Sequence, residues 1–112
     1  MTSVSKFSPR DMIFLIVSTE PNLAPLLRIK VPSRSMETQP YLAFASLDVG
    51  QFFLRVRDID DERYSVTSIV DAAKLLNANN EFLIFRSGQQ ILDSVADPEG
   101  YDYESLIQIR EL

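Results

Sequence analysis

Residues 41–59, YLAFASLDVGQFFLRVRDI, change from a strand pattern to a helix pattern at Ser46. Before Ser46 both alternating sets of positions are largely apolar, which is typical of a strand covered on both faces. After Ser46 apolar residues recur at steps of three and four, and this spacing predicts one apolar face of a helix over 47–57: Val49, Phe52, Phe53 and Val56. A strand that runs directly into a helix indicates a mixed α and β domain.

The turn between this strand and helix carries the marks of a helix cap. The Ser46 hydroxyl is placed to accept a hydrogen bond from an amide of the first helical turn, and Asp48 suits the positive end of the helix dipole. Gly50 costs about 1 kcal/mol relative to alanine inside a helix, which close packing on the sheet would explain. Neither a second glycine nor a Lys-Ser/Thr pair follows, so a phosphate loop is excluded. We interpret the turn as structural.

Four further stretches predict strands, over 12–17, 26–31, 63–68 and 81–86. In the second of these, leucine, isoleucine and valine alternate with Arg28 and Lys30, which predicts a half-exposed strand at a sheet edge. Residues 33–39 predict a mobile polar loop. Ser68, with Asp71 three residues later, predicts a helix cap, and the apolar spacing that follows predicts a helix to about Leu76.

The C-terminal part is ambiguous in its periodicity. Residues 89–95 fit either a hairpin partner of 81–86 or two helical turns, and residues 97–100, DPEG, predict a tight turn. Residues 103–112 fit a helix or an edge strand, and we favour the helix. The sequence as a whole predicts an α+β fold. We expect residues 1–112 to form a single small domain with a polar lead-in over 1–10, a mixed or antiparallel sheet of about five strands, and two or three helices packed on it.

Composition excludes several chemistries. The chain of 112 residues has no cysteine and no histidine, which removes thiolate sites, disulfides and the usual general base. The acidic stretch 58–62 begins like a calcium loop, but it has Arg63 where glycine is required and Ile69 where the final glutamate is required. We therefore predict no metal, no cofactor and no enzymatic activity.

Charge and hydropathy bear on partners and location. The net charge is −5, and such a chain is a poor candidate for binding nucleic acid. The apolar run 12–17 is too short to span a membrane and lacks the features of a secretory signal, so we predict a cytoplasmic protein without membrane contact. We expect a protein partner, and an exposed edge strand would also allow a homo-oligomer.

The acidic C-terminal segment is our predicted docking site. Four carboxylates with two tyrosines between them combine a negative potential with large contact area, a pattern that favours a basic partner surface: Asp97, Glu99, Tyr101, Asp102, Tyr103 and Glu104. A solvated turn is the alternative interpretation.

The middle of the chain resembles a known family. Residues 41–87 are similar to the N-terminal domain of the SseB family of small bacterial α/β proteins. In that family a strand ending in Phe-x-Ser leads into a helix that starts with a leucine and an acid, as Phe44, Ser46, Leu47 and Asp48 do here. The pair Leu75 and Leu76 matches the family's second motif. The resemblance implies a non-catalytic role in protein interaction and transfers no functional residue.

Three functions are compatible with these patterns. The first is a non-catalytic protein-interaction module of bacterial or phage type. The second is an acidic inhibitor or immunity protein that blocks a basic site, which would be supported if 58–62 and 97–104 folded onto one face. The third is a small ligand binder or enzyme that uses carboxylates and tyrosine in a deep pocket.

Overall fold

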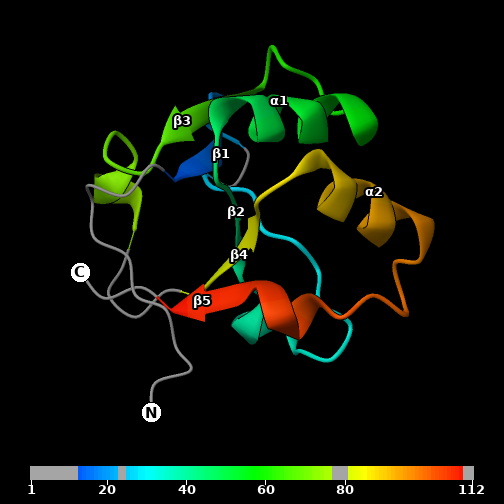
Figure 1. Ribbon diagram of the computed structural model, residues 1–112. Coiled ribbons are helices and arrows are strands. Elements are labelled where there is room, and N and C mark those ends of the chain that lie inside the picture. The colour runs from blue at the N-terminus through cyan, green and yellow to red at the C-terminus, as the bar shows by residue number, and fades with distance from the viewer. Residues whose placement is uncertain (1–12, 23–24, 77–80, 110–112) are drawn as a thin grey trace.

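The computed structural model describes residues 13–22, 25–76 and 81–109 (Figure 1). The predicted lead-in over 1–10 lies outside these residues. The elements follow in chain order: β1 (Phe14–Ser18), a 3-10 turn (Met36–Thr38), β2 (Tyr41–Phe44), α1 (Leu47–Val56), β3 (Tyr64–Ser68), a 3-10 turn (Ala73–Leu75), β4 (Glu81–Phe85), α2 (Gly88–Ala96), a 3-10 turn (Tyr103–Leu106) and β5 (Ile107–Ile109).

The strands form one mixed sheet in the order β3-β1-β2-β4-β5. The central pair β2 and β4 is parallel, and every other pair of neighbours is antiparallel. A parallel pair needs a crossover connection, and here the crossover contains α1 and β3. The predicted α+β class, with a five-stranded mixed sheet and two helices, is confirmed.

Apolar side chains fill both faces of the sheet. In β4, Leu83 and Phe85 point to the face covered by α1 and α2, whereas Phe82 and Ile84 point to the other face. That second face is covered by Ile69, Ala72 and Leu76 from the segment after β3. Because successive strand residues alternate between faces, a stretch covered on both sides must be apolar throughout, as residues 42–44 of β2 and 82–85 of β4 are.

Both helices begin at a serine directly after a parallel strand. The Ser46 hydroxyl accepts a hydrogen bond from the Val49 amide at 3.2 Å, and the Ser87 hydroxyl accepts one from the Gln90 amide at 3.3 Å. Since β2 and β4 run in the same direction, α1 and α2 start at the same end of the strands and lie side by side in Figure 1. The cap at Ser46 is confirmed, and the ambiguous residues 89–95 belong to a helix.

Gly50 allows α1 to approach the sheet closely. A Cβ atom at this position would lie 2.8 Å from a methyl group of Val66 and 3.2 Å from the Phe44 ring. The glycine is therefore explained by contact with β3 and β2, as the sequence predicted.

The strand predicted over 26–31 is wrong, whereas the mobility predicted for the polar loop over 33–39 stays a prediction. Residues 26–31 do not form a strand of the sheet: they are extended and make only single bridges, from Leu26 to Val17 and from Arg28 to Tyr41. The loop over 33–39 is held in place by Gln39, whose buried amide accepts a hydrogen bond from the Val31 N–H and donates to the carbonyls of Val31 and Arg34. Residues 26–31 contact β1 through Leu26 and β2 through Arg28, and Val31 pairs with the Gln39 side chain. The segment therefore pairs along no single strand.

Two predicted helices are also absent. After β3 the chain forms turns and a short 3-10 segment rather than a helix to Leu76, with the Ser68 hydroxyl accepting from the Asp71 amide at 3.3 Å. Short helices gain little from propensity alone, and this segment is held by burying its apolar residues. At the C-terminus a 3-10 turn leads into β5, which pairs with β4, so the edge-strand alternative for 103–112 is the one observed, over 107–109.

Replacing the capping serine should lower stability without altering the fold. Ser46→Ala removes the acceptor for the Val49 amide, and we expect a loss of about 1 kcal/mol in the free energy of unfolding. Ser87→Ala is the matched variant and should lose a similar amount. Urea denaturation monitored by circular dichroism measures both, and an unchanged midpoint for Ser46→Ala would contradict the structural interpretation of this turn.

Gly50→Ala should destabilise the protein even though alanine favours helices by about 1 kcal/mol. The added methyl group would meet Val66 at 2.8 Å, and overpacking of this kind costs about 1–3 kcal/mol. The double variant Gly50→Ala/Val66→Ala should lose less unfolding free energy than the sum of the losses in the two single variants, because the obstructing methyl group is gone. Strictly additive unfolding free energies would show that the contact does not limit the helix position.

Candidate functional site

The predicted docking segment forms a structured turn after α2. The Asp97 carboxylate accepts a hydrogen bond from the Gly100 amide at 3.1 Å, and the Asp97 carbonyl accepts one from Tyr101 at 3.0 Å. The tight turn predicted over 97–100 is thereby confirmed. Glu99 and Asp102 are exposed.

The two tyrosines of this segment are in different environments. Tyr103 is only 6% exposed and belongs to the core beneath α1 and α2. Tyr101 is half-buried and meets Tyr103 edge-on, with ring centroids 5.0 Å apart. Burial raises the pKa of both phenols, and the nearby Asp93 carboxylate raises that of Tyr101 further. Tyr103 therefore supports the fold and offers little area to a partner.

Arg34 neutralises one of the predicted carboxylates. Its Nε and Nη2 atoms donate to the two oxygens of Glu104 at 3.1 and 3.0 Å, while Nη1 donates to Glu81 at 2.6 Å. Ser33 adds a further bond to Glu104 at 3.0 Å. This arrangement raises the pKa of Arg34 and lowers the pKa of Glu104. These contacts of Ser33 and Arg34 thus connect the loop after residue 31 to Glu81 of β4 and to Glu104 of the last 3-10 turn.

A shallow hollow of about 240 Å³ lies between these two parts of the chain, lined by Val31–Ser33 and by residues 99 and 101–104. Of the six residues predicted to bind a partner, Glu104 is ion-paired with Arg34 and Tyr103 is buried in the core. The remaining residues, Asp97, Glu99, Tyr101 and Asp102, lie together on the surface around the turn. That this turn binds a partner stays a prediction.

Arg34→Gln should lower stability and weaken its dependence on pH. We expect a loss of about 1–2 kcal/mol at neutral pH, because two carboxylates lose a charged donor at a side chain only 19% exposed. The pKa of Glu104 is lower in the folded chain than in the unfolded chain, so its contribution is present above the unfolded pKa and is lost as pH falls through the folded pKa.

Unfolding free energies of wild type and Arg34→Gln at several pH values between about 7 and about 3 test this linkage. The difference between the two proteins should shrink as the pH falls. Lys30→Gln, at an exposed position, is the control for loss of one positive charge. If the difference in unfolding free energy stayed constant with pH, the contribution of Arg34 would not depend on the charge of Glu104.

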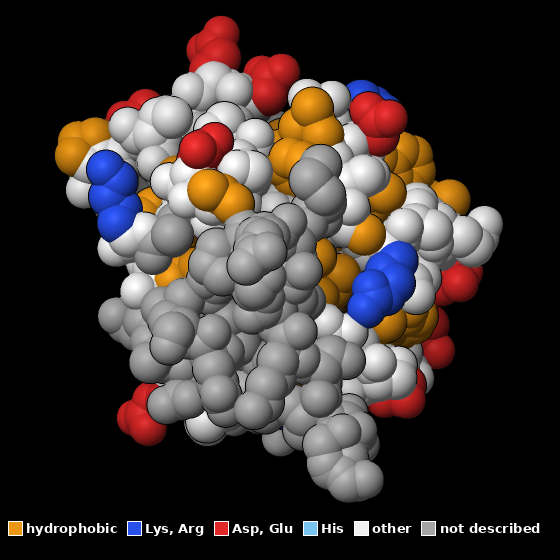
Figure 2. Space-filling model, turned by 60° about the vertical axis from the view of Figure 1, so that its left-hand side comes forward, with side chains coloured by type: hydrophobic (Ala, Val, Ile, Leu, Met, Phe, Trp, Pro, Cys, Tyr) orange, Lys and Arg blue, Asp and Glu red, His pale blue; other side chains and the backbone are white. Residues whose placement is uncertain are grey.

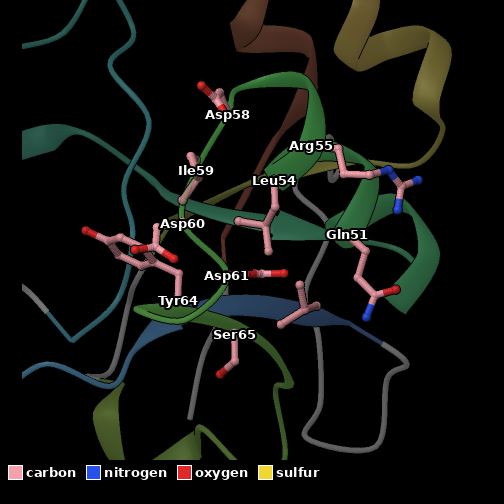
Figure 3. A pocket seen from close by; sticks show the side chains of 10 residues that line it. Gln51, Leu54, Arg55, Asp58, Ile59, Asp60, Asp61, Tyr64 and Ser65 are labelled. Atoms are coloured by element: carbon pink, nitrogen blue, oxygen red, sulfur yellow. The ribbon is translucent and has the colours of Figure 1, made fainter.

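A larger open groove of about 920 Å³ lies between α1 and β3 (Figure 3). Its walls are Gln51, Leu54 and Arg55 of α1, the loop over 58–61, and residues 64–66 of β3. In Figure 3 the Leu54 and Asp61 side chains extend into the middle of the groove, with Gln51 on one side and Asp60 and Tyr64 on the other. We call this site the α1–β3 groove.

The α1–β3 groove has an excess of negative charge. Asp58, Asp60 and Asp61 line it, and all three are exposed. Asp60 is engaged locally: it accepts the Glu62 amide at 2.8 Å and lies 3.5 Å from Arg63. Asp58 and Asp61 have no ion-pair partner among the described residues.

Arg55, the single cation among the lining residues, points away from the carboxylates. Its guanidinium lies 6.0 Å from the centre of the Phe52 ring, and Figure 3 shows it extended away from Asp58, Asp60 and Asp61. The three aspartates therefore set the sign of the potential in the groove. The apolar floor comes from Leu54, Ile59 and Val66.

The sequence indicated three interpretations of 58–62, namely a calcium loop, a solvated turn and part of an acidic face shared with 97–104, but it did not predict the groove. No group of three or more acidic residues that could hold a metal ion occurs among the described residues, and the chain has no histidine or cysteine. Asp58 has a positive φ of 53°, a conformation that aspartate and asparagine adopt more readily than most residues. The Asp58 backbone turns the chain sharply after α1, which brings the acidic loop beside β3.

The surface itself is mixed in character. Figure 2 turns the β3 side forward, and acidic side chains stand at its top, at the height of the loop after α1 in Figure 1. The hydrophobic side chains visible in this view form several separate patches rather than one continuous surface. The acidic segments 58–62 and 97–104 lie apart in Figure 1, so they do not build one acidic face.

No family model matches the chain, and no curated protein or solved structure is significantly similar to it. The resemblance of residues 41–87 to the SseB family stays a prediction. Among the described residues, no helix is long and apolar enough to cross a membrane. The predicted cytoplasmic location stays a prediction as well.

Proposed function

We propose that this protein is a non-catalytic protein-interaction module whose partner occupies the α1–β3 groove. The observation that carries the proposal is the groove itself: it is open along one side of the sheet and combines an apolar floor with unpaired carboxylates. A partner segment could bury apolar area against the half-buried Ile59 and Val66 while its polar groups meet Asp58 and Asp61. Interfaces need both contributions, since rim charges alone add little affinity.

The shape and chemistry of the groove support binding rather than catalysis. Its lining supplies carboxylates, a phenol and an amide, but the carboxylates are exposed on an open groove and do not converge in an enclosed pocket. The role implied by the SseB resemblance agrees with this proposal. The turn over 97–104 is the second candidate contact surface, because it keeps Asp97, Glu99 and Asp102 exposed beside Tyr101.

Site-specific photo-crosslinking in the native host tests the proposal. A benzophenone amino acid at Gln51, inside the groove, should form a discrete adduct with a partner, because only this position places the probe against the bound segment. The same probe at Glu99 reports on the turn after α2, and at Glu37 it reports on an exposed 3-10 turn outside both sites.

An adduct from Gln51 that is missing from Glu37 supports the groove as the contact surface. An adduct from Glu99 alone would move the contact to the turn over 97–104. If neither position yields more adduct than Glu37, the interaction function itself is wrong. Each substituted protein is first shown to have the wild-type unfolding midpoint.

A further inference from the structure

The outer edge of β3, next to the α1–β3 groove, presents backbone groups that have no hydrogen-bond partner among the described residues. β3 is the last strand of the described sheet on this side and pairs only with β1. The Thr19 amide donates to the Arg63 carbonyl at 2.9 Å, and the Ile69 amide donates to the Ile13 carbonyl at 2.7 Å. In an antiparallel pair such bonds recur at every second residue, so Ser65 and Thr67 also face β1.

The intervening residues of β3 therefore direct their backbone groups outward. Two of these groups are engaged locally, since the Tyr64 amide donates to Asp60 at 3.2 Å and the Ser68 carbonyl accepts from Ala72 at 3.0 Å. The Tyr64 carbonyl, both groups of Val66 and the Ser68 amide have no hydrogen-bond partner among the described residues. These four groups match the pattern that an added strand would pair with.

The side chains beside this edge favour a cationic partner. Tyr64 and Val66 point to the same face as α1, and both are half-buried. A residue paired with Val66 would have its side chain on this same face, beside the loop that carries Asp58 and Asp61. A lysine or arginine at that place could lay its aliphatic stem along Val66 and Ile59 and bring its charge to the carboxylates.

We propose that the occupant of the α1–β3 groove is an extended, lysine- or arginine-containing segment of a partner protein, which adds to the outer edge of β3 as a further strand. This inference rests on the proposed function and specifies its partner. The backbone bonds supply orientation and the aspartates supply selectivity for positive charge. An acidic or neutral segment could use the same edge but would lack the charge complement.

Fluorescence anisotropy with synthetic peptides tests the chemistry directly. The probe is a labelled octapeptide of alternating lysine and threonine, which places its positive charges on one face of a strand. It should bind the wild-type protein at about 0.05 M salt and bind more weakly at about 0.5 M. An octapeptide of alternating glutamate and threonine is the matched probe and should not bind.

Two double variants that remove the same charge from different places locate the site. Asp58→Asn/Asp61→Asn should weaken binding of the lysine peptide by about tenfold, because two facing charges are lost. Asparagine tolerates the positive φ of residue 58, so this variant should fold. Glu99→Gln/Asp102→Asn removes the same net charge from the turn after α2 and should change affinity by less than about twofold. If both variants lost affinity for the lysine peptide equally, the effect would come from the net charge of the protein, and the proposal would be overturned.

Val66→Pro tests the backbone contact. Proline removes the outward amide of Val66 but no bond to β1, and edge strands accept proline at such positions. We expect the folded variant to lose affinity for the lysine peptide by at least about tenfold. Val66→Ala loses the same groove-lining side chain but keeps the amide, so it should bind the lysine peptide more tightly than Val66→Pro does. Unchanged binding by a folded Val66→Pro protein would overturn strand addition.

The outcomes separate this inference from the proposed function. If the Gln51 probe captures a partner but the lysine peptide does not bind, the partner is of another chemistry and the interaction function stands. If light scattering finds a dimer that Val66→Pro converts to a monomer, the occupant is a second copy of the chain, and the proposal of a basic segment is wrong.

Discussion

The parallel pairing of β2 with β4 is the constraint on which the rest of the structure depends. Residues 41–44 lie beside residues 82–85, and nearly all of these side chains are buried because both faces of the pair are covered. Parallel strands send the chain out at the same end of the sheet, so α1 and α2 start together, and both pack on one face. Phe52 of α1 then packs against Gly88 at the start of α2, where a Cβ atom would come within 3.1 Å of its ring.

Much of this arrangement could be predicted from local signals. The cap at Ser46, the apolar spacing of α1 and the two-sided burial of β2 are properties of neighbouring residues, and these predictions are confirmed. The helix expected after Ser68 and the strand expected over 26–31 are wrong, because both depend on which distant surface the segment meets. Residues 107–109 form a strand since β4 provides a partner edge, which no local pattern specifies.

The candidate sites were harder to foresee for the same reason. Tyr103 and Glu104 have the composition of a docking surface, but Tyr103 fills the core, and Arg34, seventy residues earlier in the chain, binds Glu104. The α1–β3 groove combines residues of a helix, a loop and a strand, and its acidic loop looked like an ordinary solvated turn in the sequence. Charge patterning identifies candidate acids, whereas burial and ion pairing decide which of them stay available.

The close contact between Gly50 and Val66 has a thermodynamic consequence. It fixes α1 at a set height above β3, and both walls of the groove therefore belong to packed elements whose geometry is established on folding. A cleft with such walls is preorganised, and little conformational entropy of the protein is lost when it is filled. The ordering cost of association would fall on the incoming segment, so a segment already stiffened in an extended shape would gain the most.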